Sequence, residues 1–112
     1  MEFSCTEVGD VLIVRVMAER IDAAAALKFK DALRELTGAA SHVALDLRDV
    51  QFVDSSGLGA IVAVMKLMGM TRRLDLAGLT PTVDKVFRLT RMDSIFTIHG
   101  SVDDIPKLYQ AG

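Results

Sequence analysis

Strand-like and helix-like segments alternate along most of this chain, and that alternation restricts its fold more than any other feature. Two β-type runs, residues 3–8 and 11–17, are separated by Gly9-Asp10, a pair typical of a hairpin turn. After the hairpin, each helix-like segment is followed by a strand-like one, which gives the order ββαβαβαβα. Strands separated by helices usually pair in parallel, with right-handed crossovers. The sequence therefore predicts an α/β fold with a mixed, mostly parallel β-sheet packed by α-helices.

A capping residue and the spacing of apolar side chains define the first helix. Asp22 precedes a run of alanines, where its carboxylate can accept hydrogen bonds from the free amides of a helix start. Gly38 marks the end of this helix. Apolar positions recur at three- and four-residue steps and predict one buried stripe, formed by Ala26, Phe29, Leu33 and Leu36.

Later strands and helices follow from the same signals. Strands are predicted at residues 42–47, 73–77 and 95–98. Thr80 followed by Pro81 predicts the start of another helix, because proline is favoured at the first helical position. This helix continues to Leu89.

A short helix is expected at the C-terminal end. Its apolar residues are Ile105, Leu108 and Tyr109. Proline is tolerated only in the first turn of a helix, so Pro106 indicates an N-cap at Asp103 or Asp104 rather than at Ser101.

The second helix is apolar around much of its circumference. Lys66 is the only charged residue between positions 58 and 70. Such a helix cannot bury every side chain against one sheet. We expect Leu58, Ile61, Met65 and Met68 to pack in the core. Val62 and Gly69 lie off that stripe and are candidates for an interface.

The balance of charges argues against a nucleic-acid partner. Thirteen basic and fifteen acidic side chains give a formal net charge of -2, with both signs scattered along the chain. No basic patch matches a phosphate backbone.

Length and N-terminal composition indicate one domain inside the cell. A chain of 112 residues is within the size of one compact domain, so we expect a single domain over residues 1–112. Glu2 and Glu7 stand where a signal peptide needs basic residues and then an apolar run, and no apolar run approaches the length of a membrane span. The single cysteine, Cys5, has no partner for an internal disulfide. A cytoplasmic protein without membrane contacts is expected.

Signals for catalysis are weak. His42 and His99 are far apart and belong to no His-x-x-x-His or Cys-x-x-Cys pair, so no metal site is predicted. Gly57 and Gly59 do not complete a dinucleotide fingerprint, because Val62 stands where the third glycine belongs. We therefore expect no enzyme activity, no metal and no cofactor.

The junction Asp54-Ser55-Ser56-Gly57 is open to two interpretations. In the first, these residues only cap the second helix. In the second, a serine hydroxyl is displayed at the helix start, where another protein's active site can reach it. The two are compatible, because the amides and the positive end of a helix are suited to hold a phosphoryl group.

Residues 52–59, Phe-Val-Asp-Ser-Ser-Gly-Leu-Gly, resemble the signature of the STAS domain of bacterial anti-sigma-factor antagonists. The similarity extends over essentially the whole chain, including the opening hairpin, Asp22 before the first helix, and the strand before the signature. The resemblance implies a STAS-like single domain. One departure is Glu19, where the family commonly has glycine.

This resemblance implies a function. An unphosphorylated antagonist binds a partner anti-sigma factor, itself a serine kinase of the histidine-kinase-like ATPase type, and thereby frees a sigma factor. Phosphorylation by the kinase releases the antagonist, and a serine phosphatase resets it. The resemblance places the phosphate on Ser56 rather than Ser55, and places Asp22, Asp54, Ser55 and Gly57 at the partner surface.

Two other functions stay open from the sequence. A STAS subunit can serve as a scaffold in a transport or stress-signalling complex, with the serine acting only as a cap. A small-molecule carrier would require an apolar cavity.

Overall fold

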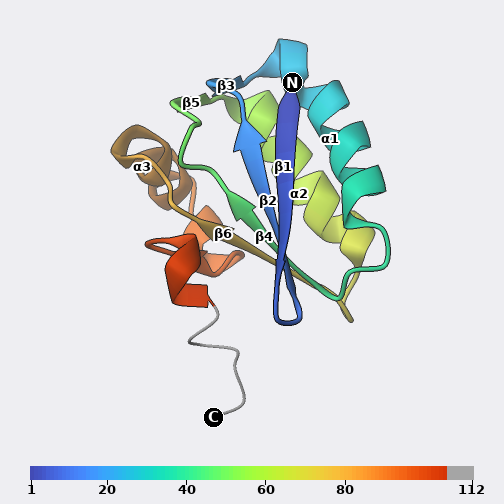
Figure 1. Cartoon of the computed structure of the whole chain (residues 1–112). Coiled ribbons are helices and arrows are strands. Elements are labelled where there is room, and N and C mark those ends of the chain that lie inside the picture. The colour runs from blue at the N-terminus through green and yellow to red at the C-terminus, as the bar shows by residue number, and fades with distance from the viewer. Residues whose placement is uncertain (106–112) are drawn as a thin grey trace.

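The computed structural model describes residues 1–105. Figure 1 shows a central β-sheet with α1 and α2 side by side on one of its faces. The sheet has the strand order β1-β2-β4-β6-β7. Its strands are β1 (Glu2–Val8), β2 (Val11–Met17), β4 (His42–Asp46), β6 (Arg73–Ala77) and β7 (Ile98–His99). A separate pair is formed by β3 (Arg20–Ile21) and β5 (Phe52–Val53). The helices are α1 (Ala23–Thr37), α2 (Ser55–Met68) and α3 (Pro81–Leu89), with 3₁₀ turns η1 (Met92–Ser94) and η2 (Val102–Asp104).

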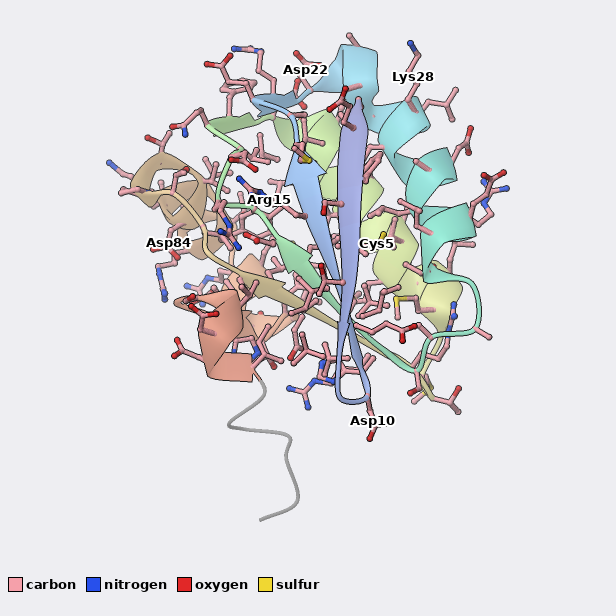
Figure 2. All side chains as sticks on the ribbon, viewed as in Figure 1. Cys5, Asp10, Arg15, Asp22, Lys28 and Asp84 are labelled. Atoms are coloured by element: carbon pink, nitrogen blue, oxygen red, sulfur yellow. The ribbon has the colours of Figure 1, made fainter. Side chains whose placement is uncertain are left out.

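Strand pairing confirms the predicted fold class. β1 and β2 are antiparallel and joined by the Gly9-Asp10 turn, in which Gly9 has a φ of 60°. That left-handed conformation suits glycine, which has no Cβ to clash. β2, β4, β6 and β7 pair in parallel in the order in which the chain visits them. Asp10 lies at the hairpin tip, at the end of the molecule opposite Asp22 (Figure 2).

The larger part of the core lies between the sheet and the helices. It combines the helix-facing side chains of the strands with Phe29 and Leu33 of α1, Ile61 and Val64 of α2, and Phe87 of α3. The opposite sheet face carries a smaller apolar cluster of Val11, Ile13, Ala44, Ala77 and Ile105. Successive strand residues point to opposite faces, so buried polar side chains such as Asp46 and Asp75 share this second face with Ala44 and Ala77.

The predicted stripe of α1 is wrong at its last position. Phe29 and Leu33 are fully buried, but Leu36 is 37% exposed and Thr37 is buried in its place. Steps of four residues lead from Phe29 through Leu33 to Thr37, so the buried face follows this row of the helix.

Helix α2 buries only part of the expected set: Ile61 and Met68 are buried as predicted. Its buried residues are Gly57, Ala60, Ile61, Val64 and Met68. Leu58 and Met65, predicted to be core, are only half-buried, as is Val62. In the described part of the chain, no helix is both long and apolar enough to cross a membrane.

The last predicted strand is displaced. Residues 95–98 were expected to be extended, but the strand is Ile98–His99. The amides of Ile95 and Phe96 both donate to the carbonyl of Met92, so the η1 turn keeps them out of the ladder. Phe96 is instead buried edge-to-face against Phe87, with the ring centroids 6.3 Å apart.

The cap predicted for the C-terminal helix, Asp103 or Asp104, remains a prediction, because Ile105 is the only residue of that helix among the described residues. Ser101, not Asp103 or Asp104, caps the η2 turn, and its side chain accepts a hydrogen bond from the amide of Asp103 at 3.2 Å. Ile105 is fully buried, as expected for an apolar residue of this segment. Three further positions of that prediction, Pro106, Leu108 and Tyr109, lie outside the described residues.

Candidate functional site

The short parallel pair β3–β5 brings the starts of α1 and α2 together. Arg20 pairs with Phe52 and Ile21 with Val53. Each strand is followed at once by an aspartate that caps a helix. Because parallel strands end at the same edge, both caps lie at one end of the molecule, which is the upper end in Figure 1.

Asp54 connects the two helix starts. Its Oδ1 accepts a hydrogen bond from the Gly57 amide at 2.9 Å, the usual N-cap contact for α2. Its Oδ2 accepts from the Ala23 amide at 3.1 Å, the first residue of α1. One carboxylate therefore satisfies free amides on two helices and fixes their separation.

Asp22 performs the matching role for α1. Its Oδ1 accepts from the Ala25 amide at 3.2 Å, and its Oδ2 pairs with Arg20 Nε at 3.2 Å. The hydrogen bond from Arg20, helped by the helix amides and opposed by partial desolvation, lowers the pKa of Asp22 below its ordinary value. Asp22 is therefore a carboxylate at neutral pH, and it adds negative charge beside the α2 start.

Gly57 is required by a close approach of α2 to β3. A Cβ built at this position would lie 1.9 Å from the carbonyl oxygen of Ile21. The Ile21 carbonyl accepts a hydrogen bond from the Asp54 amide at 3.4 Å, so this contact belongs to the junction itself. Glycine allows α2 to begin against β3, with the two preceding residues turned outward.

Ser55 and Ser56 are exposed at the first two positions of α2. Within residues 1–105, neither hydroxyl has a hydrogen-bond partner. Helix geometry leaves the two serine amides without an intrahelical acceptor, because the first amides of a helix have no preceding turn. Two hydroxyls and two donor amides therefore face outward at the positive end of the helix.

Arg20 and Phe52 were not predicted as site residues. The Arg20 guanidinium lies 4.2 Å from the centre of the Phe52 ring, and both side chains are exposed next to Asp22 and Asp54. Their meeting depends on the pairing of β3 with β5, two residues each, which no periodic pattern reveals.

Glu19 fits the loop without strain, although the family resemblance leads one to expect glycine there. Its carbonyl accepts from the amides of Gln51 and Phe52 at 2.8 and 3.2 Å. Among the non-glycine residues of the described chain, only Arg91 has a positive φ, so Glu19 needs no left-handed conformation.

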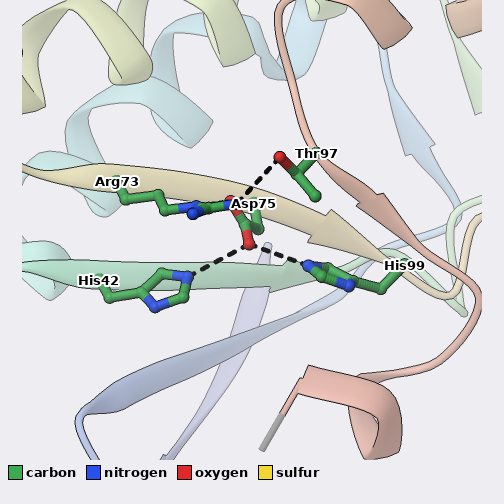
Figure 3. Close-up of polar contacts among 5 residues, drawn as sticks. All are labelled: His42, Arg73, Asp75, Thr97 and His99. Carbon is green, nitrogen blue, oxygen red and sulfur yellow. Dashed lines mark hydrogen bonds and ion pairs between the residues drawn. The ribbon is translucent and has the colours of Figure 1, made fainter. Parts of the chain in front are cut away.

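A second polar cluster lies on the sheet (Figure 3). Asp75 Oδ2 is 3.2 Å from His42 Nε2 and 2.9 Å from His99 Nε2, while Asp75 Oδ1 accepts from Arg73 Nε at 2.8 Å. No sequence pattern indicates that the two histidines meet, because β4, β6 and β7 become neighbours only through the parallel crossovers. No group of three or more His, Cys, Asp or Glu side chains in residues 1–105 is arranged to hold a metal ion.

Comparison with known proteins identifies the family. Residues 2–105 match the STAS domain family. The structure is similar to that of a proposed anti-sigma factor antagonist of Thermotoga maritima, with 27% identity over 94% of this chain and 92% of that chain and a TM-score of 0.81. It is also similar to the phosphorylated form of SpoIIAA, a Bacillus cell fate determinant, with 21% identity over 96% and 99% of the two chains and a TM-score of 0.65.

A third similar structure is that of the murine anion transporter Slc26a9. It has 19% identity and a TM-score of 0.77 over 96% of this chain, but only 19% of the transporter chain is covered. The common fold of these proteins is the one described above, and this chain belongs to the STAS domain family. The resemblance found in residues 52–59 is thus confirmed at the level of the family.

Replacing Asp54 with alanine should destabilise the protein by about 1–2 kcal/mol, because the change removes an N-cap and also the bond to α1. Asp54→Asn is the matched control. Its side-chain oxygen can still cap Gly57, but its amide nitrogen cannot accept from Ala23, so a smaller loss is expected. Urea unfolding measures both. An equal loss in the two variants would show that the hydrogen bond to Gly57 contributes nothing beyond the one to Ala23.

Proposed function

We propose that this protein is an anti-sigma-factor antagonist that acts in the cytoplasm and is switched by phosphorylation of Ser56. Its unphosphorylated form binds a kinase-type anti-sigma factor and so frees a sigma factor. Transfer of a phosphoryl group from ATP to Ser56 Oγ, with loss of the hydroxyl proton, ends that interaction. A serine phosphatase restores the hydroxyl.

The single observation that carries this proposal is the exposed pair Ser55-Ser56 at the start of α2, with no internal hydrogen bond to either hydroxyl. A serine that only capped the helix would direct its oxygen at a helix amide. Here that role belongs to Asp54. The serines are left available for another protein, in a chain whose described residues hold no metal-binding group.

The comparisons support the proposal from a different direction. The Thermotoga relative is itself a proposed anti-sigma factor antagonist. The Bacillus protein of the same fold carries a phosphoryl group in one of its structures. These are properties of those proteins, and they make a regulatory phosphorylation the first function to test here.

We assign the partner surface to the residues around the acceptor. Asp22, Asp54 and Ser55 surround Ser56 at the helix starts, and the exposed pair Arg20–Phe52 extends the surface with an aromatic ring and a cation. Aromatic and arginine side chains are common anchors of protein interfaces. Gly57 is buried, so its part is to hold α2 in place beneath this surface.

The switch acts through charge and leaves the fold intact. A phosphoryl group adds about -1.5 to -2 charges, next to the carboxylates of Asp22 and Asp54. The free amides and the dipole of α2 favour an anion at this place, so the helix is not disrupted. A surface that presented two acids and two hydroxyls becomes strongly anionic, and repulsion from acidic groups of the bound kinase weakens the complex.

Phosphopeptide mapping tests the proposal. After incubation with the cognate kinase and ATP, we expect one phosphoryl mass on the peptide that contains Ser55 and Ser56, with fragmentation placing it on Ser56. Ser56→Ala should abolish it, and Ser55→Ala should retain it. Incorporation elsewhere, or wild-type incorporation in Ser56→Ala, would contradict the assignment.

A second candidate is a STAS scaffold subunit without a phospho-switch. The observation in its favour is the similar fold within the murine transporter chain. This function predicts that incubation with kinase and ATP adds no phosphoryl group to Ser56, which the mapping experiment detects directly.

A further inference from the structure

An open hollow of about 460 Å³ lies at the C-terminal end of α2, away from the phosphorylation site. α2 supplies one wall, and the segment between η1 and β7 supplies the other. The residues that line it are Met65, Lys66, Gly69, Met70, Arg72, Arg73, Leu74, Asp75, Ile95 and Thr97. The first half of β6 forms its floor. β7 pairs only with the second half of β6, so the first half has no paired strand on that side within residues 1–105.

The backbone of β6 shows why this floor is incomplete. In a parallel ladder, alternate residues direct both the N–H and the C=O to the same side. Arg73 donates to Ser41 and Ala77 accepts from Leu47, so the odd-numbered residues of β6 bond toward β4. Leu76 donates to Thr97 at 3.0 Å and Gly78 to His99 at 3.1 Å, so the even-numbered positions bond toward β7.

Leu74 is the even-numbered residue that β7 does not reach. β7 pairs only with Leu76 and Ala77. Within residues 1–105, no backbone group beyond β7 bonds to the N–H or C=O of Leu74 on that side. One donor and one acceptor of the sheet edge therefore point toward the hollow, although Leu74 as a whole is only 6% exposed. An unpaired edge of this kind can take an extended peptide as a further strand.

The side chains around this edge are apolar and basic. Met70 and Ile95 are exposed, at 104% and 48%, and Met65 lies beside them on α2. Lys66 supplies the accessible cation of this lining. Arg72 already donates to the carbonyls of Met68, Gly38 and Ala40. Arg73 donates to Thr97 and to Asp75, which is buried and is the one carboxylate among these lining residues. Lys66 is exposed at the rim. An occupant with apolar and acidic side chains would match this lining.

We propose that this hollow, which we call the β6 notch, binds an extended, acidic and apolar segment of a partner protein. The segment adds to the sheet beside Leu74, in line with β7. Its backbone accepts from the Leu74 N–H and donates to the Leu74 C=O. An apolar side chain enters between Met65, Met70 and Ile95, and a neighbouring carboxylate pairs with Lys66.

The β6 notch is independent of the phospho-switch. It lies at the last turn of α2, while Ser56 lies in the first, and a helix of 14 residues separates them by about 20 Å. A partner held in the notch leaves the acceptor serine uncovered. The notch would thus supply a second docking point on the same molecule. This inference does not depend on phosphorylation of Ser56.

Amide hydrogen exchange of the free, full-length protein is the first test. The Leu74 amide should exchange at least a hundredfold faster than the Leu76 amide, which is bonded to Thr97. Equal protection of the two amides would show that the edge is already covered, for example by the residues after Ile105, and would overturn the proposal.

A designed peptide provides the second test. In an extended acetyl-Glu-Val-Phe-Val-Glu-amide, the two Glu side chains and the Phe project to the same side, so all three can face α2. Titrated to millimolar concentration against ¹⁵N-labelled protein, it should shift the amide signals of Leu74, Lys66 and Gly69. The same peptide methylated on its three central amides should bind at least about tenfold more weakly, because it cannot form the strand.

Charge exchange is the matched control. Lys66→Glu should weaken binding of the acidic peptide and strengthen binding of the corresponding peptide with lysines at both ends. Ser56→Asp should leave both affinities within twofold of wild type. Equal binding of the methylated peptide, no shift at Leu74, or shifts centred on the α2 start would each overturn the β6 notch as a strand-addition site.

Discussion

Gly57→Ala should destabilise the protein by about 3 kcal/mol, which is near the upper end for overpacking a buried site. The added methyl carbon would lie 1.9 Å from the Ile21 carbonyl oxygen, and neither partner is a flexible side chain. Relief requires α2 to move away from β3, which disturbs the contacts of Asp54 with both helix starts. Urea unfolding followed by circular dichroism measures this loss.

Gly59→Ala is the matched control, two residues further along the same helix. Nothing lies within 4 Å of a Cβ at this position. Alanine has the higher helix propensity, so this variant should gain about 0.5–1 kcal/mol. Equal effects at the two glycines would mean that the close approach of α2 to β3 is not what selects Gly57.

Ser56→Asp should weaken binding of the cognate kinase-type anti-sigma factor by about a hundredfold, a loss of roughly 3 kcal/mol. The added carboxylate joins Asp22 and Asp54 at the same helix starts, and like charges across an interface cost several kcal/mol. The far-UV circular dichroism spectrum should remain unchanged, because an acidic residue in the first turn is favourable to a helix. Calorimetric titration gives the affinity.

Ser41→Asp is the control for this charge change. Ser41 is an exposed serine just before β4, outside the site. The same added charge at this position should alter kinase affinity by less than twofold. If both variants weakened binding equally, the effect would be one of net charge. If Ser56→Asp lost helical signal, the charge would be acting by unfolding the α2 start.

Most of the fold could be predicted because its signals are local and repeated. Apolar runs and the Gly9-Asp10 turn marked the long strands of the hairpin, and the Asp22 and Thr80-Pro81 caps located α1 and α3 correctly. The strand β3 was missed because two residues make no period. A strand was wrongly predicted at residues 95–98, because these residues are good strand formers. In the structure, the amides of Ile95 and Phe96 bond to Met92 in a tight turn instead.

In the candidate site, too, the local features could be predicted and the contacts between distant segments could not. Asp54, Ser55, Ser56 and Gly57 are consecutive, so their cap and helix start were evident from the chain. The bond from Asp54 to Ala23, the stacking of Arg20 on Phe52 and the meeting of His42 with Asp75 join distant segments. Such contacts depend on which strands are neighbours in the sheet. A single sequence does not specify that order. The free edge at Leu74 is of the same kind, because it depends on where β7 stops.

In the proposed switch, a phosphoryl group on one exposed serine controls partner binding while the fold stays intact. Its most direct test compares the dissociation constant of the complex with the cognate kinase for protein fully phosphorylated on Ser56 and for the same sample after phosphatase treatment. We expect the phosphorylated form to bind about a hundredfold more weakly and phosphatase to restore the original affinity. Equal affinities for the two forms would show that phosphorylation of Ser56 does not control this complex.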